Sequence, residues 1–422
     1  MQHNIGRTYH DPLHGAIVLD AADSTEALLI QLIDTPEFQR LRRIRQLGPA
    51  SMTFHGAESS RFTHSLGVMA IARRAFDRLA QHHPELDSYR PVVLCAALLH
   101  DVGHGPFSHT CEEIFGSHHE HWTERILQES PEIRQLLDGY DVNLLPQMIS
   151  VYHKSHPIPL VWQLVSSQLD CDRLDYLMRD SHFTGASYGN LDLDRILLAL
   201  RYDPETQQLV VAGKGLAAIE HYLVVRYFMY AQIYNHSKNI AATLVLQQAF
   251  QRARELMAQG TLQADEVVTA WLQQDCNALP LDQYLEADDG VFVYHLQRWQ
   301  RHPDPILADL CRRFINRDLL KAMDITEMTA EEQQLLLAHV QQALAQTPFS
   351  PAYYTGIRTA FSRGYTLYQR GIKIQTKSGL REISQLSPLV QTLTQAWQRS
   401  WLLYPREVNP AQYLPKSLLN SK

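Results

Sequence analysis

The chain has few cysteines, no long apolar run and no excess of positive charge over its 422 residues. Its five cysteines are scattered without CxxC spacing, which is typical of reduced, buried residues in a cytosolic protein. The longest apolar stretch, around residues 91–99, is far too short to cross a bilayer, and the N-terminus has no apolar signal-peptide core. The net charge of −7 does not indicate a general polyanion-binding surface. We therefore expect a soluble, cytoplasmic protein that binds neither membranes nor nucleic acid.

Hydrophobic residues recur with helical periodicity along most of the chain. The pattern predicts further amphipathic helices between residues 262 and 346, after helices over residues 24–33, 37–47, 61–83, 91–100, 106–115, 119–128, 160–180 and 215–254. Residues 201–212 predict a β-hairpin. Aromatic and β-branched residues alternate in 364–377 and 400–404, which predicts a small C-terminal sheet with a helix near 386–397.

These elements predict a mostly α fold, with a large helical core and a small C-terminal α+β lobe. We expect residues 1–260 to form the core together with an N-terminal regulatory segment. Residues 261–346 should extend this core with more helices, and residues 347–422 should form the lobe. No fixed-period repeat or low-complexity linker separates these parts, so we do not expect independent modules.

Histidine is abundant, with 21 residues that are clustered rather than spread. Two His-Asp pairs occur, His10-Asp11 and His100-Asp101, where about one is expected by chance. His100 and Asp101 end an apolar helix, and charged or imidazole groups there are costly unless they are paired or bind a metal. His10 and Asp11 precede Pro12 in a polar segment, and we expect a structural role for them in a turn.

Two further residues could complete a metal site with His100 and Asp101. His64 lies inside an otherwise apolar helix, and Asp172 lies in the segment DCDRLDY. Two imidazoles and two carboxylates suit Mn, Fe or Zn and leave positions open for water and substrate. Taken alone, His64 fits a hydrogen-bonded core residue, and Asp172 fits an ion pair with Arg173. The order His, His-Asp, Asp, each in a helical context, favours one divalent transition metal per subunit.

Five segments resemble the HD-domain deoxynucleoside triphosphate triphosphohydrolase family, which includes the animal enzyme with a sterile alpha motif and bacterial homologues. They are DPLHG (11–15), IDTPEFQRLRRIRQLG (33–48), RFTHSLGV (61–68), LLHDVGHGPFSH (98–109) and DCDRLDYLMRD (170–180). The resemblance covers roughly residues 9–249 and implies an HD-domain helical core in which His64, His100, Asp101 and Asp172 bind the metal. It also implies hydrolysis at the α-phosphorus to a deoxynucleoside and triphosphate, with additional Mg carried by the nucleotide. No sterile alpha motif domain is expected before Asp11.

Three imidazoles are available for proton transfer near neutral pH, namely His104, His109 and His119. The resemblance implies that His109 meets the scissile phosphate and that His119 lies beside it. Glu112 stands where the family usually has aspartate, so it is expected to orient a histidine, with its reach left open. The alternative is a solvated histidine-rich loop, since other histidines flank His119.

A triphosphate requires cations. Arg61 and Arg226 can grip phosphate oxygens bidentately, and Arg173 can add a third charge, although relatives of the animal enzyme mostly carry lysine there. Arg226, Tyr230 and Tyr234 recur at helical spacing, which places a cation and aromatic rings on one face. Such a tyrosine stripe is by itself more often part of a core.

The resemblance also assigns the sugar and base contacts. It implies that Tyr176 and Tyr234 border the sugar and base. Gln46 and Leu47 would lie against the 3′-hydroxyl and exclude a 2′-hydroxyl, and Asp180 would accept from the 3′-hydroxyl. These roles define the expected specificity for deoxynucleotides.

A second nucleotide site is suggested by Asp34, Gln39 and Arg42, which lie within a few helical turns and could read a guanine edge. The default interpretation of such a trio is a solvated polar face. In the animal enzyme the matching positions hold an activating guanine nucleotide between subunits, and Arg317 and Lys321 match its activator-contacting segment. The resemblance therefore predicts activation by GTP or dGTP and a homo-oligomer, either tetramer or dimer.

Three functions remain open from the sequence. The first is a dNTP triphosphohydrolase, and the second is an HD-domain phosphohydrolase acting on nucleoside monophosphates or cyclic nucleotides. The arginine set and the RFTHSLG and DRLDY segments favour the first, because a monophosphate needs less positive charge. The third is a nucleotide sensor or nucleic-acid-binding protein with a dead site. The intact ligand set and the net charge of −7 disfavour it.

Overall fold

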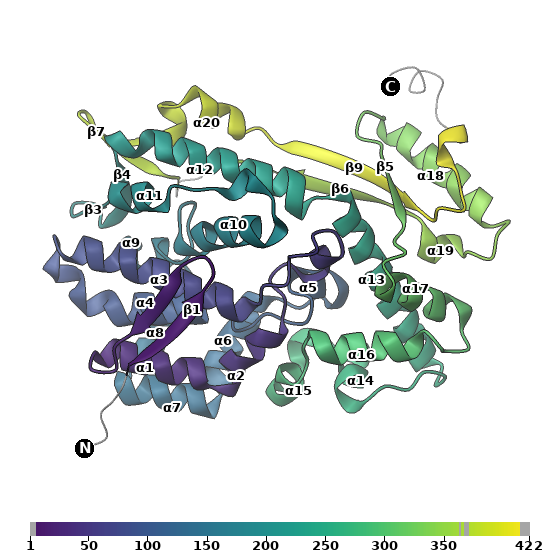
Figure 1. Cartoon of the computed structure of the whole chain (residues 1–422), viewed down its shortest axis with the longest axis horizontal. Coiled ribbons are helices and arrows are strands. Elements are labelled where there is room, and N and C mark those ends of the chain that lie inside the picture. Colours follow the sequence, from purple (N-terminus) through teal and green to yellow (C-terminus); the bar gives the residue numbers. More distant parts are fainter. Residues whose placement is uncertain (1–5, 363, 367–370, 414–422) are drawn as a thin grey trace.

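The computed structural model describes residues 6–362, 364–366 and 371–413. Twenty α-helices and nine strands lie in this part of the chain, and the strands form three small sheets (Figure 1). The predicted mostly α fold with a helical core and a small α+β lobe is confirmed. None of the described helices is both long and apolar enough to cross a bilayer.

Buried side chains form two hydrophobic clusters. The first cluster contains α3 (Arg61–Ala80), α4 (Arg90–Leu99) and the helices around them. These are α1 (Ser24–Asp34), α2 (Pro36–Arg40), α6 (His119–Glu129), α7 (Pro131–Tyr140), α8 (Leu144–Tyr152), α9 (Pro159–Gln163), α10 (Cys171–Thr184), α11 (Leu193–Ala199), α12 (Leu216–Met229) and α20 (Pro388–Leu393). Helix α4 is apolar all round and is covered on every side, with residues 92–99 all buried. It packs against α3, which in turn packs against α10.

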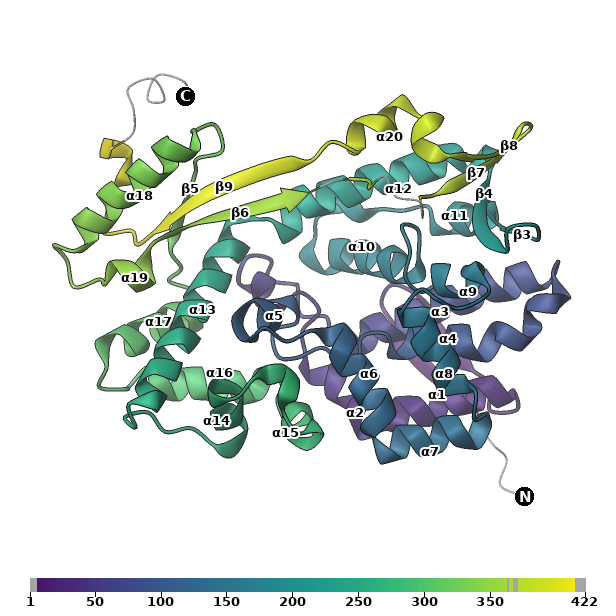
Figure 2. The ribbon, with the colours of Figure 1, turned by 180° about the vertical axis from the view of Figure 1, so that it is seen from behind.

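The second cluster lies beside the first and contains the helices around α13. They are α5 (His109–Phe115), α13 (Ser237–Ala258), α14 (Glu266–Gln273), α15 (Leu281–Leu285), α16 (Asp289–Trp299), α17 (Pro305–Ile315), α18 (Ala330–Leu344) and α19 (Pro351–Tyr354). Strands β5 (Lys321–Asp324), β6 (Gly356–Ser362) and β9 (Trp397–Tyr404) cover one side in the order β5-β9-β6. The β6–β9 pair runs from α18 towards α12 and α20, so it spans both groups of helices (Figure 2).

The C-terminal residues are shared between the two clusters. Ile374 and Val390 belong to the first cluster, whereas Tyr354 and Leu402 belong to the second. Residues 347–422 therefore do not pack around one core of their own within the part that the structure describes. The predicted boundaries at residues 260 and 346 stay predictions.

Two further sheets are small. The predicted hairpin at 201–212 is confirmed as β3 (Leu200–Asp203) and β4 (Gln208–Ala212), which continue into β7 (Lys373–Thr376) and β8 (Gly379–Glu382). Residues 367–370 of the predicted 364–377 strand region lie outside the described residues. An N-terminal hairpin of β1 (Arg7–Asp11) and β2 (Gly15–Leu19), and strand β5 within the predicted helical extension, are additions that periodicity did not predict.

Several predicted helices are wrong in their extent. The prediction over 37–47 ends early, because Ile44 is extended and Arg45 bridges to Ser60, which leaves Gln46 and Leu47 in a loop. The prediction over 106–115 begins too early, because Phe107 (φ 61°) and Ser108 (φ 56°) are left-handed. The helix predicted near 386–397 is only α20, since β9 begins within that range.

Two long predicted helices are broken. The 160–180 helix divides into α9 and α10, because Asp170 leaves the helical conformation and its side chain caps α10 by accepting from the Arg173 N–H. The 215–254 helix divides into α12 and α13, which are separated by a π-helical turn at Tyr230–Tyr234 and by Asn235. π-helical turns often occur at functional sites.

Candidate metal and nucleotide site

Four predicted metal ligands converge where α3, α4 and α10 meet. Helix α3 supplies His64, the end of α4 supplies His100 and Asp101, and the first turn of α10 supplies Asp172. The His64 Nε2 atom lies 3.1 Å from Asp172 Oδ1 and 3.5 Å from Asp101 Oδ2. The His100 Nε2 atom lies 3.6 Å from Asp172 Oδ1 and 3.4 Å from Asp101 Oδ1. Asp172 therefore points towards both histidines.

The Nδ1 atoms of His64 and His100 each make a hydrogen bond to another group. The His64 Nδ1 atom is 2.8 Å from Asp175 Oδ2, and His100 Nδ1 donates to the Ala97 carbonyl at 2.9 Å. Each Nε2 thus faces the carboxylates, and the buried His100 Nε2 has no hydrogen-bond partner among the residues that the structure describes. Ligand atoms around one ion at about 2.0–2.2 Å lie roughly 3.0–3.5 Å from one another. The spacing and chemistry of the His64, His100 and Asp101 donor atoms fit one divalent metal, and Asp172 faces both histidines from the first turn of α10.

The electrostatics of the cluster require positive charge between the carboxylates. Burial by itself lowers the pKa of His64, but hydrogen bonds to Asp172 and Asp175 outweigh it and raise the pKa to about 9. Burial also opposes protonation of His100, and the charge of Asp101 still raises its pKa. A proton or a metal ion would meet the same demand.

Arg61 lies beside the cluster. Burial would raise the pKa of Asp101, but His100 and Arg61 hold it well below its usual range. The Arg61 Nη1 atom is 2.5 Å from Asp101 Oδ2, and its Nε donates to Ser108 Oγ at 2.9 Å. Arg61 is 3% exposed and lies in the wall of a cavity. It therefore holds a predicted ligand as well as facing the space where substrate would lie.

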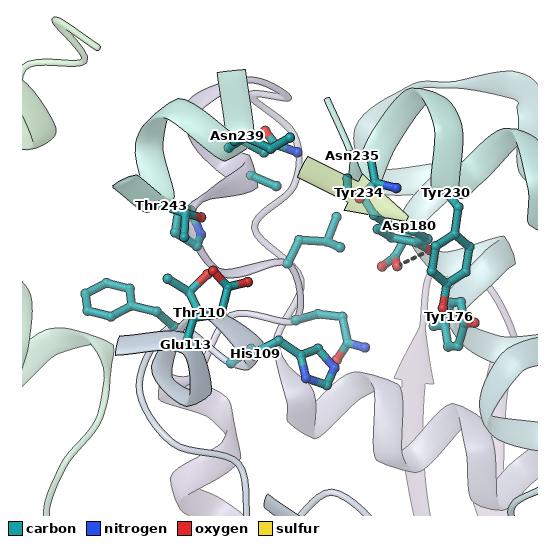
Figure 3. A pocket seen from close by; sticks show the side chains of 18 of the residues that line it. His109, Thr110, Glu113, Tyr176, Asp180, Tyr230, Tyr234, Asn235, Asn239 and Thr243 are labelled. Atoms are coloured by element: carbon teal, nitrogen blue, oxygen red, sulfur yellow. Dashed lines mark hydrogen bonds between the residues drawn. The ribbon is translucent and has the colours of Figure 1, made fainter. Parts of the chain in front are cut away.

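A cavity of about 550 Å³ opens above the cluster, a size typical of small-molecule sites. Twelve of the predicted residues line it: Gln46, Leu47, Arg61, Asp101, His104, His109, His119, Asp172, Tyr176, Asp180, Tyr230 and Tyr234. In Figure 3 the tyrosines and Asp180 gather at one end, His109 lies in the middle, and Glu113 and Thr243 lie at the other end.

The tyrosine end contains a buried carboxyl group. Tyr234 donates its hydroxyl hydrogen to Asp180 Oδ2 at 2.8 Å, and the hydroxyls of Tyr176 and Tyr230 are 3.5 Å apart (Figure 3). Burial raises the pKa of Asp180 to about 7, against the lowering effect of the Tyr234 hydrogen bond. The second oxygen, Oδ1, has no partner among the described residues. It is available to a ligand.

The three predicted catalytic histidines form one aromatic group. The rings of His104 and His119 stack with centroids 4.1 Å apart, and His109 stands edge-on to both. Glu112 reaches them, with its Oε1 2.5 Å from His119 Nδ1 and its Oε2 3.5 Å from His109 Nδ1. Burial, with the charges of Arg61 and His119, lowers the pKa of His104 well below its usual value. His104 is therefore a neutral, buried ring, and only His109 has a mostly exposed side chain.

Two predicted phosphate contacts are turned away from the cavity. Arg173 pairs with the capping Asp170, and Arg226 donates to Gln168 Oε1 at 2.9 Å. Neither side chain lines the cavity. Each has a buried Nε–H without a partner in the described part of the chain.

The five residues predicted for a regulatory nucleotide form two separate groups. Asp34 pairs with Arg7, and Arg42 donates to Gln39 Oε1 at 2.7 Å. Arg317 donates to the Met52 carbonyl, and Lys321 begins β5. Within the described residues no hydrogen bond or ion pair joins the two groups, and they lie on different elements of the chain (Figure 1).

Some cavity residues were missed by sequence analysis. They come from the π-turn region, from α5 and α13 and from strand β6: Glu113, Asn235, Asn239, Thr243, Arg358, Thr359, Ala360 and Phe361. Asn235 and Asn239 follow Tyr234 closely and could have been considered with it. Nothing in the sequence around Arg358 indicates that β6 crosses a distant cavity.

Comparisons with known proteins identify related families and chains. The HD domain model matches residues 61–180, and the model of the HD associated region matches residues 191–348. The uncharacterized protein YwfO of Bacillus subtilis is 36% identical over 95% of this chain and 93% of its own length. The crystal structure of a phosphohydrolase from Bacteroides thetaiotaomicron matches with a TM-score of 0.83 and 31% identity, over 95% of this chain and 100% of that one. Deoxynucleoside triphosphate triphosphohydrolase SAMHD1 of Gallus gallus is 29% identical over 59% of this chain and 46% of its own length.

Proposed function

This chain belongs to the HD-domain phosphohydrolase family, as its motifs predicted, and we propose that it hydrolyses deoxynucleoside triphosphates to deoxynucleoside and triphosphate. The observation that carries the proposal is the convergence of His64, His100, Asp101 and Asp172 beneath a nucleotide-sized cavity. Similarity to SAMHD1, named as a deoxynucleoside triphosphate triphosphohydrolase, supports this substrate class.

The four ligands would hold Mn, Fe or Zn, because two nitrogen and two oxygen donors suit these ions. When bound, such a metal supplies an activated water and polarises a phosphoryl oxygen. Asp101 and Asp172 are the ligands that line the cavity, so a substrate would approach from their side. Additional Mg would accompany the nucleotide.

Proton transfer to the leaving oxygen would fall to the histidine group. Glu112 holds His119 through Nδ1, which leaves Nε2 as the free nitrogen of a ring that lines the cavity. His109 is exposed in the middle of the cavity, where it can meet the scissile phosphate (Figure 3). Neutral His104 stacks under His119 and fixes the plane of that ring.

The deoxyribose would lie at the tyrosine end. Asp180 Oδ1 and Gln46 Oε1 are buried oxygens without hydrogen-bond partners in the described part of the chain, and both can accept from a 3′-hydroxyl. Leu47 would close the space beside the 2′ carbon. Arg61 would contact the phosphates directly, and the unpartnered Nε–H groups of Arg173 and Arg226 could be satisfied by phosphate oxygens after a side-chain movement.

Product identification tests the proposed reaction. Purified protein is incubated with Mn²⁺ and dGTP, and the products are separated by ion-exchange chromatography. We expect deoxyguanosine and inorganic triphosphate in equal amounts. Orthophosphate or pyrophosphate from dGTP would contradict the proposal, as would hydrolysis of nucleoside monophosphates or cyclic nucleotides without any triphosphate from dGTP.

The same proposal includes activation by a guanine nucleotide, GTP or dGTP, at Asp34, Gln39 and Arg42 of one subunit and at Arg317 and Lys321 of another. A cluster of cations around Arg317 and Lys321 supports the binding of an anion there. The pKa of Lys238 is lowered by burial and by the neighbouring charges of Lys321, Arg317 and Arg406. The separation of the two groups in one subunit would require a tetramer or dimer. If added GTP leaves both dATP hydrolysis and the sedimentation mass unchanged, activation is excluded.

A further inference from the structure

The DPLHG segment, residues 11–15, forms the turn of the β1–β2 hairpin and is not used by the reaction proposed above. Asp11 Oδ1 accepts from the backbone N–H groups of Leu13 and His14, both at 2.9 Å. Gly15 then takes a left-handed conformation (φ 71°), which closes the turn at little cost. The turn lies beside α10 (Figure 1), and the His14 side chain contacts Asp175 on that helix.

Asp175 on α10 is the centre of the contact. Its Oδ1 is 2.5 Å from His14 Nε2 and accepts from Arg179 Nη2 at 3.0 Å. Its Oδ2 accepts from Arg179 Nε at 2.7 Å and is 2.8 Å from His64 Nδ1. Arg179 also donates to Asp11 Oδ2 at 2.8 Å. The hairpin turn is therefore joined to a predicted metal ligand through buried, charge-assisted hydrogen bonds.

The packing between α3 and α10 leaves space for the Asp175 side chain. A Cβ atom on Gly67, one turn after His64 on α3, would lie 2.0 Å from Asp175 Oδ1 and 2.5 Å from Arg179 Nη2. Only glycine leaves this space. The side chains of Asp175 and Arg179 have no solvent exposure, and that of His14 has 7%.

We propose that His14 and Asp175 are positioning residues of the metal centre, so that the N-terminal hairpin is part of the apparatus that orients His64. Asp175 takes the Nδ1–H of His64 and thereby directs the free Nε2 at Asp101 and Asp172. His14 supplies one of the donors that hold Asp175 in place. This inference rests on the proposed metal site.

Outer hydrogen bonds of this kind typically change metal affinity by about 10–100-fold when they are removed. We therefore expect His14→Ala to weaken metal binding roughly tenfold. His14→Gln should restore most of the affinity, since a glutamine amide can donate from nearly the same position as the histidine Nε2. Asp175→Asn should weaken binding further, because it removes the charge that favours the Nδ1–H tautomer of His64.

The test is a titration of the full chain with Co²⁺, in which binding is measured from the visible absorption of the bound ion. His10→Ala is the matched control, because His10 is an exposed histidine on the same hairpin. The expected order of affinity is wild type, His10→Ala and His14→Gln together, then His14→Ala, then Asp175→Asn. Thermal melting of each variant separates loss of metal binding from loss of the fold. If His14→Ala does not fold, the Co²⁺ affinities of His14→Gln and Asp175→Asn are compared with that of the wild type instead.

The possible failures are distinguishable. If the wild type binds no Co²⁺, the proposed metal site itself is wrong and the inference falls with it. If the wild type binds Co²⁺ and hydrolyses dGTP, while His14→Ala binds the ion with unchanged affinity and spectrum, only the positioning role is overturned.

Discussion

His64 and His100 share one hydrogen-bonding arrangement. Both rings donate through Nδ1, one to a carboxylate and one to a carbonyl, and both present Nε2 to the same pair of carboxylates. A hydrogen-bonded core histidine would not need a second carboxylate facing its free nitrogen. The local chemistry therefore favours metal binding by His64 over the role of a hydrogen-bonded core residue.

Removing one ligand should abolish both metal content and turnover. His64→Ala and Asp101→Ala each delete a donor and leave uncompensated buried charge, so we expect the bound metal to fall to background by elemental analysis and dGTP hydrolysis to stop. His10→Ala should behave as the wild type. Turnover retained by either ligand variant would contradict the assigned site.

Asp180 should make substrate binding depend on pH. Burial raises its pKa to about 7, so the carboxyl is protonated below that pH and ionised above it. An ionised carboxylate accepts from a 3′-hydroxyl more strongly, by about 1–1.5 kcal/mol. We expect kcat/KM for dGTP to rise roughly tenfold as the pH increases through 7. Asp180→Asn should lack this step while other inflections persist, and an unchanged profile would exclude Asp180 from sugar binding.

At the scale of elements, the four proposed ligands could be predicted because each lies in a recognisable local motif. The partners that hold them could not: His14 and Asp175 are 161 residues apart and meet only through the packing of the hairpin on α10. Helix breaks were missed for similar reasons. Periodicity continues through Asp170, but its side chain is a better cap than a helix interior residue, and no local pattern marks the π-turn at Tyr230.

Helices α3 and α10 approach closely only because residue 67 is glycine. In Gly67→Ala the added methyl group would overlap Asp175 and Arg179, and overpacking of this kind costs about 1–3 kcal/mol. We expect a lower Tm together with weaker Co²⁺ binding. Gly139→Ala in α7 is the matched control, because a Cβ there meets nothing within 4 Å, and it should be neutral or slightly stabilising. Equal behaviour of the two variants would refute the packing argument.

At the scale of the whole molecule, the cavity is closed by segments far apart in the chain. The metal cluster and tyrosines come from the HD core, whereas β6 contributes Arg358 and its three successors. The position of β6 depends on its pairing with β9 and on the second hydrophobic cluster. Pairing between distant strands cannot be recognised in the local sequence, so the residues of β6 that line the cavity were not predicted. The fold class could be predicted because it depends on helical periodicity along the chain.

Arg358 lines the cavity from β6, and we predict that it gives the C-terminal lobe a direct part in substrate binding. It donates to Gln247. Burial raises the pKa of Glu113, and the nearby charge of Arg358 opposes this rise, so Arg358 lies near the end of the cavity opposite the tyrosines. A bound nucleotide that extends from Asp180 past His109 would bring a polar or anionic group towards this cation. Losing a charged hydrogen bond of about 1.5 kcal/mol should raise KM for dGTP roughly tenfold in Arg358→Ala, with metal content and Tm unchanged. Arg381→Ala, on exposed β8 of the same lobe, should leave KM as in the wild type. If both variants show the wild-type KM, the lobe closes the cavity without contacting substrate.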